Sequence, residues 1–326
     1  MIVTLTLNPS LDRTVTLDRL VPGAVLRTSE PVLEPGGKGV NVTRALTANG
    51  HPSIAVVPVA GAEGSELGRL LDAAEVDGRY VAVSGRTRSN LSIVGDDGTV
   101  TKLNEPGSPL DADDLLAIAT TLRGTVRPGD WLVVSGSVTP GLIADDLRAL
   151  IEAAGAGGAQ VAVDTSGEAL AAAVSAAPRI LKPNRDELAE LVGRPLHTIA
   201  HVLDAARQVR DGGVGIVLVT LGAAGAVLVA DDVELVGESP VARPVSPVGA
   251  GDCLLAGFLS RYGADGAFSA GASVESDLAD AFTTGLTWGA AAAGLPGSAV
   301  PSPGDLHPEN VQLVWQPDLD RPLVAG

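Results

Sequence analysis

A regular alternation between apolar runs and helical patterns constrains the fold of this chain more than any other feature. Each apolar run has the length of a buried strand, and each helical stretch is long enough to connect two parallel strands. Four helix-then-strand units lie between residues 111 and 220: "DADDLLAIATTLR" with "WLVVSG", 143–154 with "QVAVDTS", 167–177 with "RILKPN", and 198–210 with "GIVLVT". Such units build a parallel sheet with helices on both faces, so we predict an α/β fold.

The first third of the chain carries a different pattern. Alternating apolar runs predict strands at 2–7, 13–17 and 53–60. Helical patterns predict one helix from near Val40 to about Ala48 and another at 65–74, for which Ser65 is a candidate N-cap. Residues 90–104 predict a hairpin that turns at Asp97-Gly98. The strands that do not fit the parallel sheet predict a smaller β-sheet lid, formed by insertions at about 10–33 and 86–106.

The remainder predicts a single domain over 1–326. Helical patterns at about 249–262 and 275–293 are expected to close it. The Pro-rich stretch from Pro301 onward is expected to be irregular and to pack loosely on the surface.

Composition excludes several classes of protein. The formal net charge of −17 argues against a nucleic-acid-binding or anionic-membrane surface, because both need clustered cations. The single cysteine, Cys253, allows no intrachain disulfide, which fits a reducing, cytoplasmic compartment. Its apolar neighbours favour a small buried side chain over a reactive thiol. The N-terminus lacks the features of a signal peptide, and no apolar stretch is long enough to span a bilayer.

Lysine is scarce in this chain. Only Lys38, Lys102 and Lys182 are lysines among the 22 basic residues, so each raises the question of why it is present. Lys102 lies on the second strand of the predicted hairpin and is expected to be exposed. The other two lie in segments that carry candidate ligand-binding groups.

The segment "SPVGAGDCLLAGFL" (246–259) places small residues and one carboxylate at the start of a predicted helix. Glycines before a helix let backbone N–H groups converge on an anion, and the helix N-terminus adds partial positive charge. We therefore interpret Gly249, Ala250 and Gly251 as an anion hole for a phosphoryl group. Asp252 would be the base that takes the proton from an attacking hydroxyl. The alternative is an ordinary helix start with an N-terminal aspartate.

Three further segments carry polar groups next to glycines or strand ends. "GGKG" places Gly36, Gly37 and Lys38 ahead of a helix with Asn41 in its first turn, which suits a polar ligand. "VTLGAAGAVLV" (219–229) predicts a strand, a glycine turn and a second strand that a nucleotide could approach closely. "LKPNRDEL" (181–188) supplies Lys182, and its Asn184 and Glu187 could hold Mg²⁺ through water.

Several standard sites are absent from the sequence. It has no P-loop, no third glycine of the dinucleotide fingerprint and no protein-kinase signatures. His197 and His201 are four residues apart but have no third ligand at metal spacing, so they are expected to be surface residues.

Taken together, the segments resemble the PfkB, or ribokinase-like, family of carbohydrate kinases. The resemblance covers nearly the whole chain and rests on the order of these motifs: "TLNPSLD", "GGKGVNVTRAL", "GRTRSN", "VSGSVTPG", "DTSGEAL", "LKPNRDEL", "VTLGAAGA" and "VGAGD". It implies a Rossmann-like parallel sheet flanked by helices, with a β-sheet lid. "TLNPSLD", "TRSN" and "SGEAL" are most similar to the branch of the family that acts on phosphosugars.

The resemblance also implies roles for individual residues. Substrate contacts are implied for Asp12, Gly36, Gly37, Lys38 and Asn41, phosphate contacts for Arg27, Lys38 and Arg88 with Asn90 beside them, nucleotide contacts for Lys182, Asn184, Thr220, Gly222, Gly225 and Gly249, a magnesium-linked role for Asn184 and Glu187, and the role of base for Asp252. Ser137, at the end of a strand on the ligand side of the sheet, is a further candidate for substrate contact. Glu34 and Asp164 are expected to be structural. Pro247 stands where related kinases usually have threonine, and no role is assigned to it.

The implied activity is phosphorylation of a phosphosugar by Mg-ATP. Fructose 1-phosphate is favoured by "GRTRSN" and the intact "GGKG", with tagatose 6-phosphate and fructose 6-phosphate as alternatives. A kinase of an unphosphorylated sugar or nucleoside would leave Arg27 and Arg88 without a function, and a non-catalytic sugar- or nucleotide-sensing module would not need Asp252. A lid with an exposed edge predicts a homodimer formed through the lid.

Overall fold

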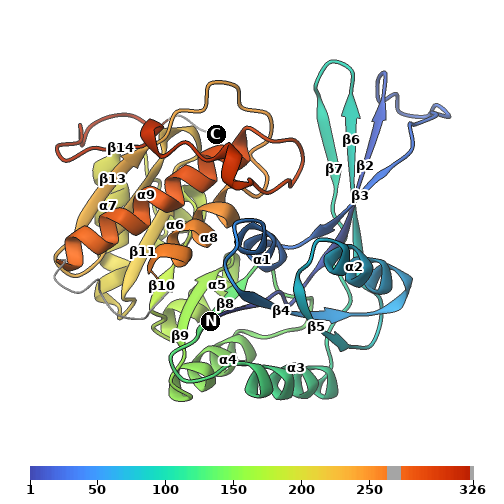
Figure 1. Cartoon of the computed structure of the whole chain (residues 1–326), viewed down its shortest axis with the longest axis horizontal. Coiled ribbons are helices and arrows are strands. Elements are labelled where there is room, and N and C mark those ends of the chain that lie inside the picture. The colour runs from blue at the N-terminus through green and yellow to red at the C-terminus, as the bar shows by residue number, and fades with distance from the viewer. Residues whose placement is uncertain (263–272, 324–326) are drawn as a thin grey trace.

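The computed structural model describes residues 1–262 and 273–323. In these residues the main element is a ten-stranded sheet (Figure 1). In order across the sheet, the strands are β14 (Gln312–Leu313), β13 (Glu234–Glu238), β12 (Ala226–Val229), β11 (Ile216–Thr220), β10 (Ile180–Leu181), β9 (Gln160–Asp164), β8 (Trp131–Ser135), β1 (Ile2–Leu5), β4 (Ser53–Val59) and β5 (Asp77–Ala82). Neighbours from β11 to β5 are parallel, and β12 to β14 continue the sheet as an antiparallel edge. The predicted α/β fold is confirmed.

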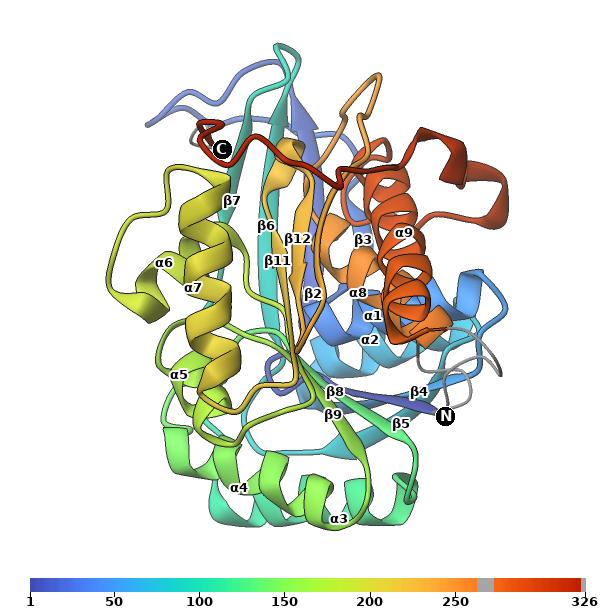
Figure 2. The same ribbon diagram turned by 90° about the vertical axis from the view of Figure 1, so that its left-hand side faces the viewer.

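Helices cover both faces of this sheet (Figure 2). One face carries α3 (Ala112–Thr125), α4 (Ala144–Ala156), α5 (Gly167–Ser175), α6 (Arg185–Val192) and α7 (Ile199–Asp211), and the other carries α1 (Lys38–Ala48), α2 (Gly61–Ala73), α8 (Ala250–Tyr262) and α9 (Val274–Ala293). Successive strand residues point to opposite faces, so Val3 of β1 packs with the first set of helices and Ile2 with the second. The apolar runs are continuous because both faces are buried.

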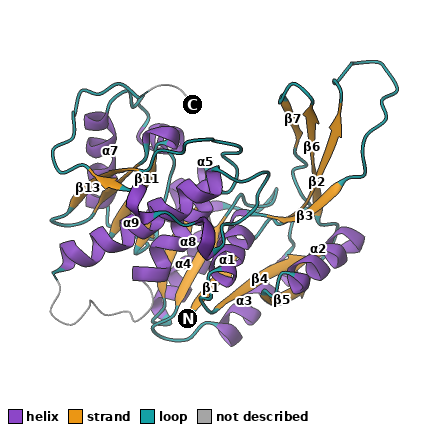
Figure 3. Ribbon diagram, turned by 45° about the horizontal axis from the view of Figure 1, so that its top comes forward, coloured by secondary structure: helices purple, strands orange, loops and turns teal. Residues whose placement is uncertain are grey.

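A separate four-stranded sheet stands apart from the main body (Figures 1 and 3). Its strands are, in order, β3 (Val32–Gly36), β2 (Ser10–Leu17), β6 (Arg88–Gly95) and β7 (Val100–Leu103). β2 runs antiparallel to β3 and parallel to β6, and β7 returns along β6 after the turn at Asp97 and Gly98. We call this four-stranded sheet the small sheet.

The register of the small sheet sets polar residues side by side at the end nearest the main body. Ser10 lies opposite Arg88, and Asp12 lies between Asn90 on one side and Glu34 on the other. Asp12 and Asn90, which are far apart in the sequence, are therefore neighbours on adjacent strands.

Two expectations about local structure are wrong. The second helix begins at Gly61, where a φ of +68° turns the chain, so Ser65 lies inside the helix and its hydroxyl donates to the Gly61 carbonyl. The residue at the N-cap is Ala60. The stretch from Pro301 is not wholly irregular, because Gln312 and Leu313 pair with β13 as the edge strand β14.

Among the helices that the structure describes, none combines the length and apolar composition needed to cross a membrane. The longest, α9, has 20 residues and packs over one face of the large sheet.

The turn after β11 requires glycine at position 225. Gly225 has a φ of +93°, and a Cβ there would lie 2.0 Å from the Gly237 carbonyl oxygen on β13. Gly193, which ends α6, has a φ of +68° with open space around it.

These two glycines make a matched pair for mutagenesis. Gly193→Ala should lower the free energy of unfolding by about 1–2 kcal/mol, the cost of a left-handed backbone. Gly225→Ala should lower it by about 2–5 kcal/mol, because a steric overlap is added. Urea denaturation measures both values. Equal losses would show that the β11–β12 turn moves freely enough to admit a side chain.

Candidate active site

Several of the predicted site residues lie at the carboxyl ends of the parallel strands, where open α/β sheets bind their ligands. Asp164 ends β9, and Lys182 follows β10. The N-termini of α1 and α8 meet at the same edge, because Asn41 of α1 contacts Asp252 of α8. Four segments of the chain thus contribute to one polar cluster.

Asp164 is the centre of this cluster. Its carboxylate is fully buried and accepts from Lys38 Nζ at 2.8 Å through one oxygen, while the other oxygen lies 2.9 Å from Lys182 Nζ. Burial would raise the pKa of Asp164, but the two ammonium groups outweigh it and the pKa is lowered. The expectation that Asp164 is only structural is incomplete, since it holds two of the chain's three lysines.

Lys38 also stays charged. Burial acts to lower the pKa of Lys38, but the carboxylates of Asp164 and of Glu187, 3.5 Å away, outweigh it and the pKa is raised. Its side chain is 35% exposed, so the ammonium group is accessible to a ligand.

The glycines before Lys38 are required by close contacts. At Gly37, where φ is +123°, a Cβ would lie 2.7 Å from the Thr6 side chain, and at Gly36 it would lie 2.5 Å from the Asp12 carboxylate. The backbone of this segment therefore fits between the end of β1 and the small sheet.

Asp252 lies in the first turn of α8 and is buried. Its Oδ2 accepts from Asn41 Nδ2 at 2.8 Å. Burial and the nearby Asp164 raise the pKa of Asp252 to about 6, against the opposing effects of Lys38, Asn41 and Lys182. A carboxylate with this pKa is ionised at neutral pH and is still a useful proton acceptor.

Gly249, Ala250 and Gly251 precede Asp252 at the start of α8. Gly249 has a φ of +78°, and a Cβ on Gly251 would lie 3.3 Å from Lys182 Nζ. The lysine therefore sits directly against this turn. The first N–H groups of a helix lack intrahelical acceptors, and here the Ala250 N–H donates to the Pro247 carbonyl oxygen at 3.4 Å. The turn could therefore offer its other N–H groups, together with the Lys182 cation, to an anionic group.

The small sheet contributes Asp12, Asn90 and Arg88. Asp12 Oδ1 accepts from Ser10 Oγ at 2.7 Å and from Asn90 Nδ2 at 2.9 Å. Arg88 donates to the carbonyl oxygens of Asn8 and Glu105, each at 3.2 Å. These two bonds fix the start of β6 and use only part of the guanidinium's donor capacity.

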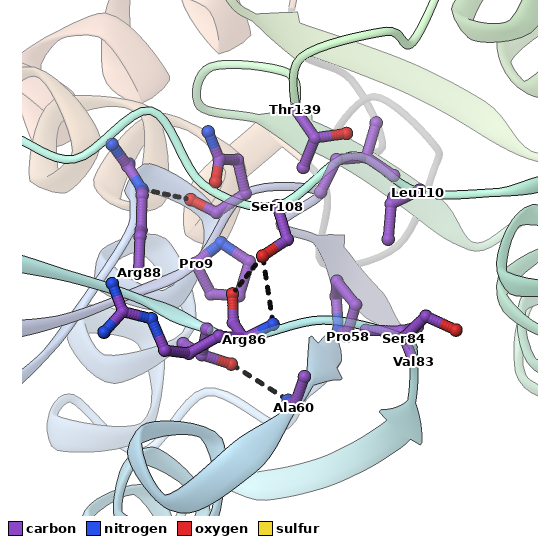
Figure 4. Close-up of a pocket in the computed structure, with 13 residues that line it drawn as sticks. Pro9, Pro58, Ala60, Val83, Ser84, Arg86, Arg88, Ser108, Leu110 and Thr139 are labelled. Atoms are coloured by element: carbon purple, nitrogen blue, oxygen red, sulfur yellow. Dashed lines mark hydrogen bonds between the residues drawn. The ribbon is translucent and has the colours of Figure 1, made fainter.

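A small recess lies beside Arg88 (Figure 4). It is lined by residues that include Pro9, Pro58, Ser108 and Thr139. Only about 20 Å³ is open to the centre of a water-sized sphere, which is room for a water molecule and not for a sugar.

Two predicted substrate residues lie apart from the cluster. Arg27 is exposed in the segment between β2 and β3, two residues before Ser29, whose N–H donates to the Thr16 carbonyl oxygen. Within the described chain it makes no hydrogen bond or ion pair. Ser137 is exposed, and its hydroxyl accepts from Asn8 Nδ2 at 3.3 Å, so part of its role is to hold the end of β1.

The predicted nucleotide residues lie at the next strand ends. Thr220 pairs with Asn184 in a parallel bridge, and its N–H donates to the Pro183 carbonyl at 3.1 Å. Gly222, with a φ of +60°, has open space around it. Gly225, in contrast, is required by the approach of the Gly237 backbone, so its conformation needs no nucleotide to explain it.

Asn184 and Glu187 form a capping box at the start of α6. Asn184 Oδ1 accepts from the Glu187 N–H and Glu187 Oε2 accepts from the Asn184 N–H, both at 2.8 Å. Across residues 1–262 and 273–323, no three His, Cys, Asp or Glu side chains group as metal ligands. If Mg²⁺ binds here, Asn184 and Glu187 would hold it through water with the lone pairs that capping leaves free. The second carboxylate oxygen of Glu187, Oε1, also lies 3.5 Å from Lys38 Nζ.

Sequence reasoning missed three contributors: Asp164, Asn8 and Arg44. Asn8 holds the backbone of Pro106 and Val138 through its amide. Arg44 lies one turn after Asn41 on α1 and contacts its side chain. The spacing of three residues between Asn41 and Arg44 in the predicted helix could have indicated that their side chains meet. The partners of Asp164 are revealed only by the three-dimensional structure.

Removing the charge of Asp164 should destabilise the protein. Asp164→Asn leaves the buried Lys182 and the partly exposed Lys38 without their shared partner, and we expect a loss of about 3–5 kcal/mol in the free energy of unfolding. Because the folded-state pKa is lowered, this contribution is present above the unfolded-state value of about 3.9 and is lost as the pH falls through the folded-state pKa. The difference between wild type and variant should therefore shrink in acid.

The matched control is Asp145→Asn, whose carboxylate is 73% exposed and pairs with Arg148. It should change stability by no more than about 1 kcal/mol. Denaturation curves at several pH values measure both variants, and a cost as small for Asp164 as for Asp145 would contradict the central role of Asp164.

Comparison with known proteins agrees with this geometry. The family model for the pfkB family carbohydrate kinase matches residues 5–304. The chain is 41% identical over 262 residues to the 1-phosphofructokinase of Rhodobacter capsulatus, covering 79% of this chain and 82% of that protein. It is 37% identical over 257 residues to the ATP-dependent 6-phosphofructokinase isozyme 2 of Escherichia coli, covering 78% and 83%.

A solved structure gives the same result for the fold. Phosphofructokinase-2 from Escherichia coli, in complex with fructose-6-phosphate, superposes with a TM-score of 0.84 at 33% identity, covering 93% of this chain and 96% of that one. The expected family is therefore confirmed: the chain belongs to the pfkB family of carbohydrate kinases, and is a phosphotransferase that acts on a sugar hydroxyl.

Proposed function

We propose that this protein is an ATP-dependent phosphosugar kinase that converts fructose 1-phosphate and ATP to fructose 1,6-bisphosphate and ADP. The observation that carries the proposal is the buried Asp252 carboxylate at the N-terminus of α8, beside a turn that Lys182 contacts. A base next to an anion-binding turn is the arrangement that phosphoryl transfer to an alcohol needs.

The proposed chemistry needs one proton transfer and one phosphoryl transfer. Asp252 accepts the proton of the substrate hydroxyl while the oxygen of that hydroxyl attacks the γ-phosphorus of ATP. The bond between the γ-phosphorus and the oxygen that bridges the β- and γ-phosphates breaks, and ADP is released. The N–H groups of residues 249–251 and the Lys182 ammonium stabilise the negative charge on the transferred group. Asp164 holds Lys182 in place and keeps it charged.

Cations near the hydroxyl support a phosphorylated substrate. A phosphate ester carries about two negative charges at neutral pH, and the net charge of −17 would repel it unless cations gather locally. Lys38 is protonated and accessible, and Arg88 retains free donors. Asp12, Asn41 and Asn90, with Gly36 and Gly37, would receive the sugar hydroxyls; a role for Arg27 or Ser137 stays a prediction.

Relatives named as 1-phosphofructokinases favour fructose 1-phosphate. A relative named as a 6-phosphofructokinase keeps fructose 6-phosphate as the alternative, with tagatose 6-phosphate beside it. The decisive experiment is ADP release measured against these three phosphosugars and against fructose. A clear preference for fructose would overturn the proposal in favour of a plain sugar kinase.

The nucleotide is proposed to bind along the turn after β11, near Thr220 and Gly222, with its phosphates reaching Gly249, Lys182 and Asn184. Gly225 shapes this turn. Mg²⁺, held through water by Asn184 and Glu187, would neutralise phosphate charge.

A homodimer formed through the small sheet and a cytoplasmic location remain part of the proposal. The edge strands β3 and β7 expose Val32, Val100 and Leu103, each more than half exposed. Such edges favour pairing with another chain.

Replacing the base should remove turnover and spare nucleotide binding. Asp252→Asn should lower kcat by about 10²–10⁴-fold while leaving the ATP dissociation constant nearly unchanged, because the anion hole is backbone. Asp113→Asn, an exposed acid in the first turn of α3, is the control and should behave as wild type. Wild-type kcat in Asp252→Asn, measured by coupled assay, would remove the central assignment.

Removing the Arg88 guanidinium on the small sheet should change the KM for the phosphosugar and leave the KM for ATP unchanged. A charge-assisted hydrogen bond contributes about 1.5–3 kcal/mol, so Arg88→Ala should raise KM for fructose 1-phosphate about 10- to 150-fold. KM for ATP should stay nearly constant, and the preference for fructose 1-phosphate over fructose should narrow.

The neighbouring Arg86→Ala is the control, because Arg86 is exposed and pairs with Glu105 at 2.9 Å. Its KM values should match wild type. If Arg88→Ala changes only the KM for ATP, Arg88 is not a phosphate ligand.

A further inference from the structure

Arg44 lies behind the base on α1 and contacts three oxygens from different segments. Its Nη1 is 3.3 Å from Asn41 Oδ1, 3.2 Å from the Ser298 carbonyl oxygen and 3.4 Å from the Pro35 carbonyl oxygen. Asn41 and Arg44 are three residues apart and share one face of the helix. The guanidinium thus joins α1 to β3 of the small sheet and to the loop after α9.

Asn41 stands between Arg44 and Asp252. An asparagine side chain has one end that accepts and one that donates, and only its surroundings decide which way it points. Arginine can only donate, and an ionised carboxylate can only accept. With Arg44 on one side and Asp252 on the other, one orientation satisfies both neighbours: Oδ1 toward Arg44 and Nδ2 toward Asp252, as observed.

The opposite orientation would be costly while Arg44 is present. It would place the Asn41 NH₂ against a guanidinium and its carbonyl oxygen against the Asp252 carboxylate. Without Arg44, nothing on that side distinguishes the two orientations. The carbonyl oxygen could then face Asp252 whenever Asp252 is protonated.

Charged groups around the pair support a fixed arrangement. Burial lowers the pKa of Arg44, while the carboxylates of Glu34 on β3 and Asp12 on β2 favour its charged form. Cys253 of α8 also faces Arg44, and it is a neutral thiol because burial raises its pKa. Asp252 is faced by Asp164, Lys38 and Lys182 as well as by Asn41. The small sheet holds Arg44 through the Pro35 carbonyl oxygen, which lies next to Glu34 on β3.

We propose that Arg44 is a positioning residue for phosphoryl transfer, which fixes the Asn41 amide so that its NH₂ always meets the Asp252 carboxylate. The inference rests on the proposed role of Asp252 as the base. Arg44 contacts no reacting atom, and its effect passes through Asn41.

The test is the pH dependence of kcat/KM, which reports the base in the free enzyme. Wild type should lose activity in acid with a midpoint near pH 6, since the pKa of Asp252 is about 6. Arg44→Gln can either donate or accept, so it no longer selects one orientation. Loss of the donor to the carboxylate favours the protonated acid, so the midpoint should rise by about one pH unit, a tenfold change in the dissociation constant.

Two variants separate this effect from simple packing. Arg44→Lys still only donates and should keep the wild-type midpoint, whereas a packing defect would affect it as much as Arg44→Gln. Arg69→Gln, at a 64% exposed arginine on α2, should also keep it. If Arg44→Gln does not reach the wild-type circular dichroism spectrum, Arg44→Met replaces it with the same expected shift.

A double-mutant cycle tests the route through Asn41. Asn41→Leu should itself raise the midpoint, and adding Arg44→Gln should then change nothing further, because no amide remains to orient. Additive shifts, or no shift in Arg44→Gln, would overturn the inference and leave Asp252 as the base. Absence of any acid midpoint in wild type would overturn both the inference and the proposed base.

Discussion

The arrangement of the candidate site depends on one buried carboxylate. Asp164 ends a central strand, and its two oxygens hold lysines from segments 126 residues before it and 18 residues after it. Its backbone carbonyl also accepts from the Gly136 N–H at 2.8 Å. A buried charge of this kind is tolerated only with well-placed partners, so the glycine segment before α1 and the end of β10 are held to the same point of the sheet.

The same cluster separates the behaviour of two carboxylates. Asp164 has a lowered pKa because two ammonium groups contact it, whereas the pKa of Asp252 is raised by burial and by Asp164 itself. The pKa values of the two acids are shifted in opposite directions. Asp164 therefore stays charged and holds the two lysines, whereas Asp252 can exchange a proton near neutral pH. The fold produces this division by giving Asp252 an amide as its hydrogen-bond partner and giving Asp164 both lysines.

The sequence predicted the features that depend on local pattern. Alternating apolar runs predicted the sheet and its helices, and the glycine segments predicted where α1 and α8 begin. The partners of Asp164 and Arg44 could not be predicted, because they come from residues brought together only by folding. Ser65 was misleading for a related reason: a positive φ at Gly61 begins α2 earlier than any capping side chain indicates. Arg27, assigned through the family resemblance, lies in the exposed segment between β2 and β3, and its role stays a prediction.

The way Asp164 holds two lysines has a consequence for protein labelling. Amine-directed reagents attack the neutral amine, and Lys38 is kept protonated while Lys182 is only 3% exposed. Lys102, exposed on the outer strand β7 of the small sheet, is therefore the reactive lysine. The α-amine of Met1, which pairs with Asp130, is a second amine that such reagents can reach. Thiol reagents meet the opposite situation, since Cys253 is buried. The natural chain therefore offers a fluorophore attachment point on the small sheet without an engineered cysteine, from which movement of that sheet against the main body could be observed directly.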